Sequence, residues 1–342
     1  DGIRDGTVTG VQTCALPIFG GVAGVLADAT CTFIRAKPGL YTADGCDAAG
    51  EVVVDGLGVD APEAEGALSE PDQFEALLVP RRRNTHKGSF GSVAVVGGGL
   101  GMVGAPLLAA RAALRVGAGR VYVDCIGAPD LRFDLAQPEL MFRSLASLAE
   151  IDAIVVGCGL GTDDAAAGAL AAAFERSVPL VVDADALNLL ADGSRFSGAF
   201  EAHAAGRVLT PHPLEAARLL GTTAREVQAD RIGAARALAR RTASIVVLKG
   251  AGTVIAHPAG RWWINATGGP ALATAGTGDV LAGMIGAFIA QRIEPVQAAL
   301  AAVWLHGRAA DDHGGDVGLV AGELAVRAAD LLARLRGKDA QA

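Results

Sequence analysis

Aromatic residues make up only 4% of this 342-residue chain, and no apolar run is long enough to span a membrane. The apolar stretch nearest the start, residues 14–27, contains Pro17 and is shorter than the roughly 20 residues that a spanning helix needs. Basic residues are not in excess either, since the net charge is −8. This charge argues against nucleic acid or an anionic membrane as the main partner.

A cysteine framework is also missing. The cysteines are five in number and scattered, and no CxxC pair occurs among Cys14, Cys31, Cys46, Cys125 and Cys158. Such spacing favours reduced thiols in a cytoplasmic protein over disulfide bonds or a structural zinc site.

Small and apolar residues are abundant instead. Hydrophobic residues account for 51% of the chain, and glycine occurs 46 times. A chain of this length can bury a large core, and its composition predicts helices that pack closely on a sheet through small side chains. We expect one large domain and a smaller remainder.

Predicted strands and helices alternate along most of the chain. This order predicts an α/β fold with a mainly parallel central sheet and helices on both faces. The predicted strands are 92–96, 120–124, 151–156, 178–182, 208–210 and 245–248, and helices are expected at 105–116, 280–288, 295–311 and 319–335.

Residues 265–285 form the centre of the prediction. Gly276 and Gly278 flank Thr277, and apolar residues then recur at helical spacing from Val280 onward, so a glycine turn leads into a helix N-terminus. Bare amides at such a terminus bind anions, and Asp279 lies beside them. The pattern indicates phosphoryl transfer or elimination with Asp279 as a base; the alternative is that Asp279 only begins an ordinary helix.

A second glycine motif supports a competing hypothesis. Gly99, Gly101 and Gly104 satisfy GxGxxG after a predicted strand and before a helix, and Asp124 ends the following strand. This order is typical of a dinucleotide-binding fold, in which the acid binds ribose. An NAD-binding module therefore remains an alternative at this point.

Further polar residues follow predicted strands. Asp183 and Asp185 could hold Mg²⁺ through water, or could simply cap a helix. His212 is fixed between two prolines and is a candidate ligand, and Lys249 adds a cation to a glycine turn. A late group of acids and histidines is predicted to be solvated helix-end charge, not a metal site: His306, Asp311, Asp312, His313 and Asp316.

Several of these motifs together resemble one family. The sequence reads HKGSFGS at 86–92, TPHP at 210–213, KGAGT at 249–253, NATGG at 265–269 and GTGD at 276–279. In this order they resemble the ADP-dependent NAD(P)H-hydrate dehydratases of the ribokinase-like superfamily. A departure is Cys158, where the family usually has proline.

The resemblance implies site residues and partners. Asp279 would bind the NAD(P)H hydrate and take the proton from its hydroxyl. Ala105, Gly161 and His212 would also bind this substrate. ADP or ATP is implied as phosphoryl donor with Mg²⁺, for which no protein ligand is assigned, and a homo-oligomer is expected. A vitamin-precursor kinase of the same superfamily remains the alternative. The implied nucleotide-binding residues are Lys249, Gly250, Ala251, Gly252, Thr253, Gly276, Thr277 and Gly278.

The start of the chain is expected to differ in origin from the main domain. Residues 1–18 are predicted to be a non-native artefact, because back-translation of 8–18 can give the DNA of a common sequencing adapter. Residues 19–60 resemble the end of the epimerase domain of the bifunctional repair enzyme, without that domain's catalytic residues, so epimerase activity is expected to be absent. Residues 61–84 are predicted as linker and 85–338 as the dehydratase domain.

Overall fold

A ten-stranded sheet forms the centre of the protein, in a computed structural model that describes residues 3–4, 7–8, 26–60, 64–192 and 196–338. Neighbouring strands are parallel, except that β13 runs antiparallel to both β12 and β14. In spatial order the strands are β5 (Gly66–Leu68), β14 (Trp262–Asn265), β13 (Thr253–Ala256), β12 (Ile245–Leu248), β11 (Arg207–Leu209), β10 (Leu180–Val182), β9 (Ala153–Val156), β6 (Ser92–Gly97), β7 (Arg120–Cys125) and β8 (Met141–Phe142).

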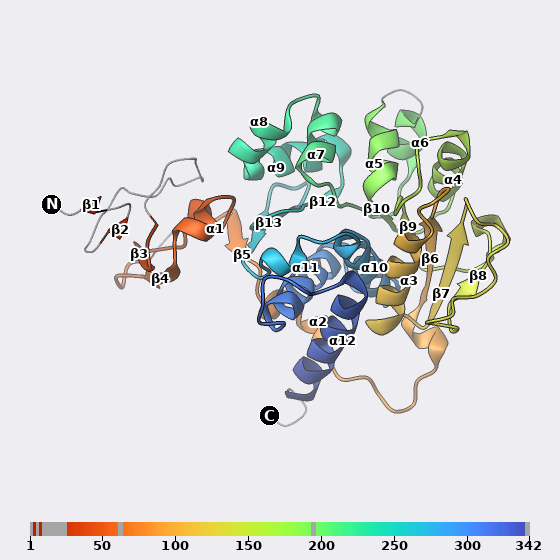
Figure 1. Cartoon of the computed structure of the whole chain (residues 1–342), viewed down its shortest axis with the longest axis horizontal. Coiled ribbons are helices and arrows are strands. Elements are labelled where there is room, and N and C mark those ends of the chain that lie inside the picture. Colours follow the sequence, from red (N-terminus) through yellow and green to blue (C-terminus); the bar gives the residue numbers. More distant parts are fainter. Residues whose placement is uncertain (1–2, 5–6, 9–25, 61–63, 193–195, 339–342) are drawn as a thin grey trace.

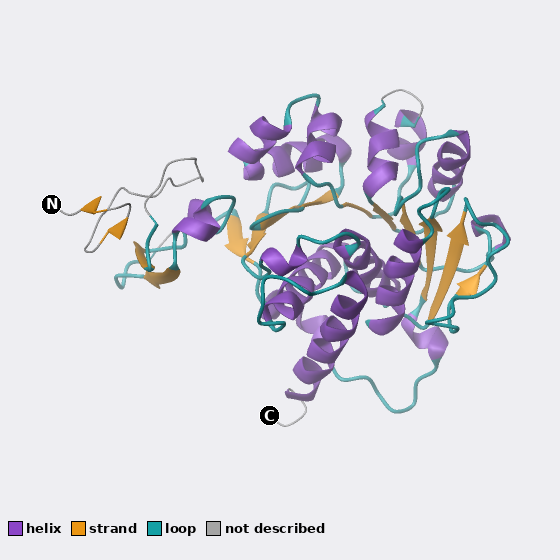
Figure 2. Ribbon diagram, in the orientation of Figure 1, coloured by secondary structure: helices purple, strands orange, loops and turns teal. Residues whose placement is uncertain are grey.

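Helices cover both faces of this sheet, which confirms the predicted α/β class (Figures 1 and 2). One layer contains α3 (Gly104–Arg115), α10 (Thr277–Ala290), α11 (Pro295–Asp311) and α12 (Ala321–Lys338). The other contains α4 (Asp164–Phe174), α5 (Ala184–Ala191), α6 (Ser197–Ala202), α7 (Pro213–Leu220), α8 (Ala224–Ala229) and α9 (Arg231–Thr242). Short turns add α1 (Gly45–Ala48), α2 (Glu75–Leu78), η1 (Pro38–Leu40), η2 (Pro71–Phe74), η3 (Lys87–Phe90), η4 (Leu145–Ser147) and η5 (Pro270–Leu272).

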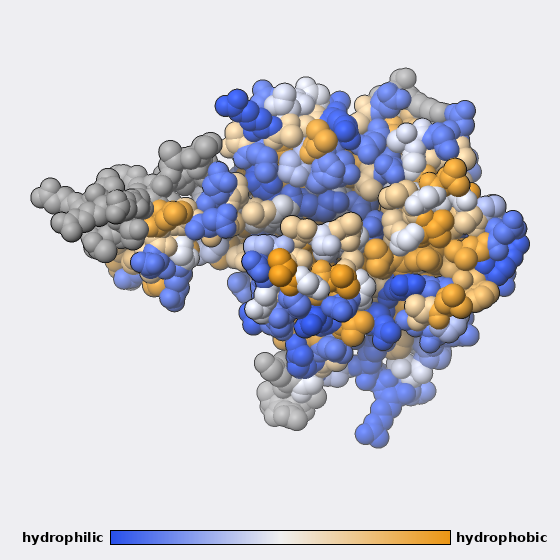
Figure 3. Space-filling view, in the orientation of Figure 1, coloured by the Kyte–Doolittle hydropathy of each residue, from blue (hydrophilic) through white to orange (hydrophobic). Residues whose placement is uncertain are grey.

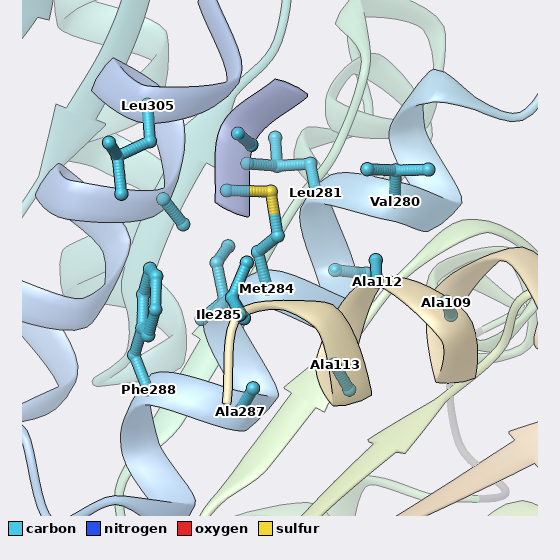
Figure 4. Packing of buried hydrophobic residues seen from close by; sticks show 14 of the residues in the cluster. Ala109, Ala112, Ala113, Val280, Leu281, Met284, Ile285, Ala287, Phe288 and Leu305 are labelled. Atoms are coloured by element: carbon cyan, nitrogen blue, oxygen red, sulfur yellow. The ribbon is translucent and has the colours of Figure 1, made fainter. Parts of the chain in front are cut away.

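Helix α10 is the most deeply buried helix of its layer, and it packs through small residues. A Cβ atom at Gly283 would lie 2.0 Å from the carbonyl oxygen of Ala109 in α3, so only glycine allows these helices to approach so closely. On another side of α10, Met284, Ile285 and Phe288 are fully buried in the core (Figure 4). Close packing of this kind explains how the chain builds a large core with few aromatic residues.

The segment predicted as a linker belongs partly to the main domain. Within residues 61–84, β5 pairs in parallel with β14, and Phe74 and Leu77 are fully buried in the core. The linker prediction is therefore wrong for residues 66–78. Pro71, Asp72 and the nearby glutamates give this stretch a polar composition that hides three short apolar elements.

Residues 29–55 form a separate two-stranded parallel sheet. Its strands are β3 (Ala29–Phe33) and β4 (Glu51–Asp55), and α1 lies between them in the chain. Phe33 and Val53 are about half exposed, which is unusual for apolar strand residues. Of residues 1–18, only the short paired strands β1 (Ile3–Arg4) and β2 (Thr7–Val8) are described, so the predicted artefact lies mostly outside the described residues.

None of the helices in the described ranges is both long and apolar enough to cross a membrane.

Candidate active site

Loops from four neighbouring parallel strands meet at one edge of the sheet. Strands β9, β10, β11 and β12 lie side by side, and each is followed at its carboxyl end by a residue of the predicted site region. These residues are Gly157, Asp183, Thr210 and Lys249. Figure 3 shows hydrophilic residues between helices α7 to α9 and helices α10 and α11. In α/β proteins this edge is where ligands bind.

The N-terminus of α10 points bare amides toward this edge. Gly276 caps the helix with φ of 90°, a left-handed conformation that glycine adopts without strain. The first helical hydrogen bond joins the Val280 amide to the Gly276 carbonyl at 3.1 Å, so the amides of residues 277–279 precede the helical ladder. Gly278 leaves open space toward Lys249, because a Cβ there would meet only the Lys249 Nζ, at 3.4 Å. Bare amides at a helix N-terminus and an ammonium group are both groups that attract an anion.

Five side chains converge beside these amides. One oxygen each of Asp183 and Asp279 and the Cys158 Sγ all lie within 4.8 Å of one another. Lys249 Nζ donates to Asp183 Oδ1 at 2.7 Å, and Thr210 Oγ1 donates to the same oxygen at 2.7 Å. Asp183 is only 1% exposed, so its charge is compensated mainly by Lys249.

Burial and neighbouring charge set the ionisation of the two key groups. Burial, and after it the nearby charge of Asp183, raise the pKa of Asp279 from its ordinary 3.8 to about 6, against the lowering effects of Cys158 and Lys249. Burial alone would lower the pKa of Lys249, but Asp183 and Glu215 outweigh it and the pKa is raised. Near neutral pH the site therefore holds a weakly acidic carboxyl group that can accept a proton and a lysine that stays charged.

This raised pKa predicts the acid limb of the pH profile. If Asp279 acts as a base, it must be ionised, so the rate should be full above its pKa of about 6 and fall as the pH drops through that value. We expect kcat/KM to decrease about tenfold per pH unit below this point. Rates that stay constant from pH 8 to pH 5 would contradict a proton-accepting role for Asp279.

The predicted nucleotide loop is held by an arginine that the sequence did not reveal. Gly250 and Gly252 have φ of 131° and 63°, so the turn after β12 requires glycine at both positions. Arg231 Nη2, on α9, donates to the carbonyls of Leu248, Lys249 and Gly252 at 3.2 to 3.3 Å. Its guanidinium is buried and fixes the loop from behind, with Thr253 Oγ1 donating to the Gly250 carbonyl at 3.0 Å.

The small N-terminal unit also touches this loop. The amide of Ala43 donates to the carbonyl of Ala251 at 3.1 Å. A Cβ at Gly252 would lie 1.8 Å from the carbonyl oxygen of Tyr41, so the two segments are in close backbone contact. The KGAGT loop is thus positioned from both sides.

The residues predicted to hold the substrate lie on adjacent loops. Gly161 has φ of 82°, and its amide donates to Asp185 Oδ2 at 2.8 Å. Ala105 is the second residue of α3 and faces the same loop, since a Cβ at Gly159 would be 3.0 Å from the Ala105 Cβ. The structure brings these loops together, and substrate binding by Ala105 and Gly161 stays a prediction.

His212 has a structural role that accounts for its two prolines. Its Nδ1 accepts hydrogen bonds from the amides of Leu214 and Glu215, at 3.1 and 3.3 Å, and so caps α7. Its Nε2 lies 3.2 Å from Glu215 Oε1. Burial and the charge of Lys249 lower the pKa of His212, so a neutral imidazole is favoured. Its contact with substrate stays a prediction.

The GxGxxG loop is used differently from a pyrophosphate-binding loop. The amides of Gly98 and Gly99 donate to the carbonyls of Cys158 and Gly159, at 3.0 and 2.7 Å. Asp124, the candidate ribose ligand, accepts a bond from the Leu145 amide at 2.7 Å. Because these groups already bind protein atoms, the geometry does not favour an NAD-binding module.

His306 differs from its prediction as a solvated charge. It is 7% exposed and sits on the face of α11 that meets α10. Nearby charges do pair on the surface, as Asp312 binds both Arg308 and Arg334. No metal-like group of ligands occurs around His306 and Asp311 in the described part of the chain, where Cys158, Asp183 and Asp279 form the one such group.

The sequence reasoning left several participants out of the site. The cluster contains Cys158 and Thr210, and it contains Asp183 as the partner of Lys249. Arg231 supports the adjacent loop at residues 249–253. The only sequence signal for the three cluster residues is their position at strand ends: Asp183 and Thr210 directly follow β10 and β11, and Cys158 is the second residue after β9. Arg231 lies in an ordinary charged helix, so nothing in its surroundings marked it.

Comparison with known proteins identifies the family. The profile of the NAD(P)H-hydrate dehydratase family matches residues 93–332. An ADP-dependent (S)-NAD(P)H-hydrate dehydratase of Neisseria meningitidis is 44% identical over 275 residues, covering 76% of this chain and 89% of the relative. A bifunctional NAD(P)H-hydrate repair enzyme of Escherichia coli is 41% identical over 300 residues, covering 84% of this chain but 57% of the relative.

Solved structures agree in fold. The ADP/ATP-dependent NAD(P)H-hydrate dehydratase of Bacillus subtilis, co-crystallised with ATP and Mg²⁺, superposes with a TM-score of 0.68 at 31% identity, covering 80% of this chain and 98% of that one. A ribokinase-like superfamily protein of Enterococcus faecalis gives a TM-score of 0.70 at 26% identity, covering 81% and 99%. The fold is therefore ribokinase-like, as predicted.

The bifunctional relatives are longer than this chain, which spans 57% of the E. coli enzyme and 63% of its Coxiella burnetii counterpart. The match to the C. burnetii enzyme covers 88% of this chain and thus extends beyond the profile match at residues 93–332. The cluster at the N-terminus of α10 lies within the matched region, as do all four strands that supply its loops. On its sequence and its fold, this chain belongs to the NAD(P)H-hydrate dehydratase family.

Proposed function

We propose that the protein is a nucleotide-dependent dehydratase that restores NADH and NADPH from their (S)-hydrates, with ADP as the expected phosphoryl donor. The observation that carries this proposal is the pairing of a carboxyl group of raised pKa, Asp279, with bare helix amides and the ammonium group of Lys249. A base and an anion site at one point suit transfer of a phosphoryl group to an alcohol. Relatives with this activity share the fold.

The proposed reaction has two steps. Asp279 takes the proton of the ring hydroxyl while that oxygen attacks the terminal phosphorus of the nucleotide, and the bond from this phosphorus to its bridging oxygen breaks, so that AMP leaves from ADP, or ADP from ATP. The amides at Gly276 to Gly278 and the Lys249 ammonium hold the charge that develops on the transferred group. Phosphate then leaves the ring carbon with the electrons of the C–O bond, and loss of a ring proton restores the dihydropyridine.

The remaining nucleotide contacts are assigned to the loop after β12. Gly250, Ala251, Gly252 and Thr253 turn beside Lys249, held by Arg231 and by the backbone of Tyr41. Two nearby carboxylates are already engaged, since Asp183 binds Lys249 and Asp185 binds the Gly161 amide, and the third, Asp279, is needed as the base. Mg²⁺ therefore fits best on the nucleotide phosphates, where it neutralises charge, and we assign it no protein ligand.

One assay tests the dependence on nucleotide. Hydrated NADH is mixed with the enzyme and Mg²⁺, with ADP, with ATP or without nucleotide, and the absorbance of reduced nicotinamide is followed. We expect recovery only when a nucleotide is present, and faster recovery with ADP. Equal recovery without nucleotide would contradict a phosphoryl-transfer route.

Residues 19–60 are proposed to be the end of an epimerase domain. The apolar side chains of Phe33 and Val53 are exposed on a sheet of only two strands, as expected for a fragment of a larger sheet. We predict that neither the chain as given nor a form lacking residues 1–18 epimerises the (R)-hydrate, and that both dehydrate the (S)-hydrate at the same rate. Measurable epimerisation would show that residues 19–60 retain function.

A homo-oligomer and a cytoplasmic location are also proposed. Leu100 and Leu135 are 94% and 90% exposed, on loops joined by a bond from the Gly127 amide to the Gly98 carbonyl. Exposed leucines on adjoining loops suit an interface between copies. The four cysteines within the described residues are all free, and two of them are buried, which suits a reducing compartment.

A further inference from the structure

The turn that carries the anion site is held by a buried histidine on a different helix. The Nε2 of His306, on α11, lies 2.8 Å from the carbonyl oxygen of Thr277, the first residue of α10. A carbonyl can only accept, so this ring nitrogen carries the proton and donates it. His306 thus contacts the backbone of the GTGD motif.

Thr277 is fixed from its side chain as well. Its hydroxyl lies 3.1 Å from the carbonyls of Leu272 and Thr274, to which it donates. The hydroxyl is therefore used to close the preceding turn, and the imidazole holds the same residue through its carbonyl. Two anchors on one residue determine the direction in which the amides of residues 277–279 point.

Helix α11 is itself locked against the preceding NATGG segment. Thr267 Oγ1 donates to the Trp304 carbonyl at 3.1 Å, and the Gly268 amide donates to Asp311 at 3.1 Å. A Cβ at Gly307 would lie 2.3 Å from Thr267 Oγ1, so the residue next to His306 is in closest contact with this loop. These contacts consequently fix the position of the His306 imidazole along the axis of α10.

We infer that His306 is a positioning residue for the proposed reaction: it holds the Thr277 carbonyl so that the anion-site amides keep the geometry needed for phosphoryl transfer. The inference rests on the proposed function. Burial lowers the pKa of His306 to about 4, so the ring is neutral at working pH and donates its hydrogen bond without taking part in proton transfer. Its effect should fall on the rate and not on the shape of the pH profile.

Three variants separate positioning from simple stability. His306→Phe keeps a ring but removes the donor, whereas His306→Gln can place an amide nitrogen near the original Nε2. His203→Phe is a matched control, because His203 is equally buried and bonds the Phe174 carbonyl through Nδ1 at 3.2 Å, at the far end of α4. We expect His306→Phe to lower kcat about 10- to 100-fold, with KM values for both substrates within about threefold.

The other variants should behave differently. His306→Gln should regain kcat to within about threefold of the parent, and His203→Phe should lose melting temperature but keep its kcat. The pH dependence should be the same in all folded variants. Unchanged kcat in His306→Phe, or an equal loss of kcat in His203→Phe, would overturn the inference. If His306→Phe does not fold, His306→Asn, which is too short to reach Thr277, replaces it.

Hydrogen exchange gives a readout that does not depend on turnover. In His306→Phe, amides in a peptide covering residues 276–280 should exchange about tenfold faster, the worth of one hydrogen bond, and His306→Gln should not show this. If the parent enzyme lacks dehydratase activity, the proposed function fails while this exchange test still decides the role of His306. Unaltered exchange in His306→Phe would refute the positioning role itself.

Discussion

Asp279→Asn is expected to lower kcat by about 10²- to 10⁴-fold, which is the usual contribution of a positioned base. Asparagine keeps the size and polarity of the side chain but cannot accept the proton of the substrate hydroxyl. Binding of ADP, followed by calorimetric titration, should change little. Activity within about threefold of the parent enzyme would mean that Asp279 only begins the helix.

The same substitution should not lower stability near pH 8. The pKa of Asp279 is raised from 3.8 to about 6 in the folded protein, so the folded state holds this proton more tightly than the unfolded state does. The stability gained from proton binding at Asp279 is therefore fully present below pH 4 and is lost as the pH rises through 6. Removing the charge beside Asp183 should leave the melting temperature at pH 8 unchanged or higher, as often occurs when an active-site charge is removed.

Gly278→Val is expected to reduce kcat about 10²- to 10³-fold, the cost of losing an anion-site donor. A side chain at Gly278 enters the space in front of Lys249 Nζ, where the transferred phosphoryl group should lie. Binding of the hydrate should persist, because Ala105 and Gly161 belong to other segments of the chain. The measurement is kcat and KM for both substrates.

Gly322→Val is the matched control for this substitution. Gly322 is the second residue of α12, as Gly278 is of α10, and a Cβ there meets no atom within 4 Å. Both changes introduce the same branched side chain into the first turn of a helix, so their local costs should be similar. Equal effects on kcat would show that Gly278 is only a packing position.

The fold was predictable wherever an element carries its own pattern. Continuous apolar strands bounded by glycine or acid, such as 245–248, and the Ala-rich helix 295–311 were located at their observed bounds. The predicted strands do not include the antiparallel hairpin of β13 and β14, because Thr253, the first residue of β13, belongs to the KGAGT motif. Strand β5 was missed because its three residues are stable only when paired with β14.

The sequence motifs of the candidate site were predictable, whereas the residues that hold those motifs in place were not. The glycine-rich segments predict roles for Asp279, Lys249 and Gly278, and the structure places Gly278 opposite Lys249. Bonds such as that from His306 to Thr277 join residues 29 positions apart and depend on the angle at which two helices pack. Such contacts have no local sequence pattern, so only the packed structure reveals them.

Simultaneous measurement of phosphate and reduced nicotinamide tests the central claim most directly. The enzyme is given hydrated NADH, ADP and Mg²⁺, and both products are followed through a single time course. Phosphorylation followed by elimination predicts one phosphate released for each NADH restored. A stable phosphorylated hydrate without released phosphate would indicate a kinase, and NADH formed without any phosphate would contradict phosphoryl transfer altogether.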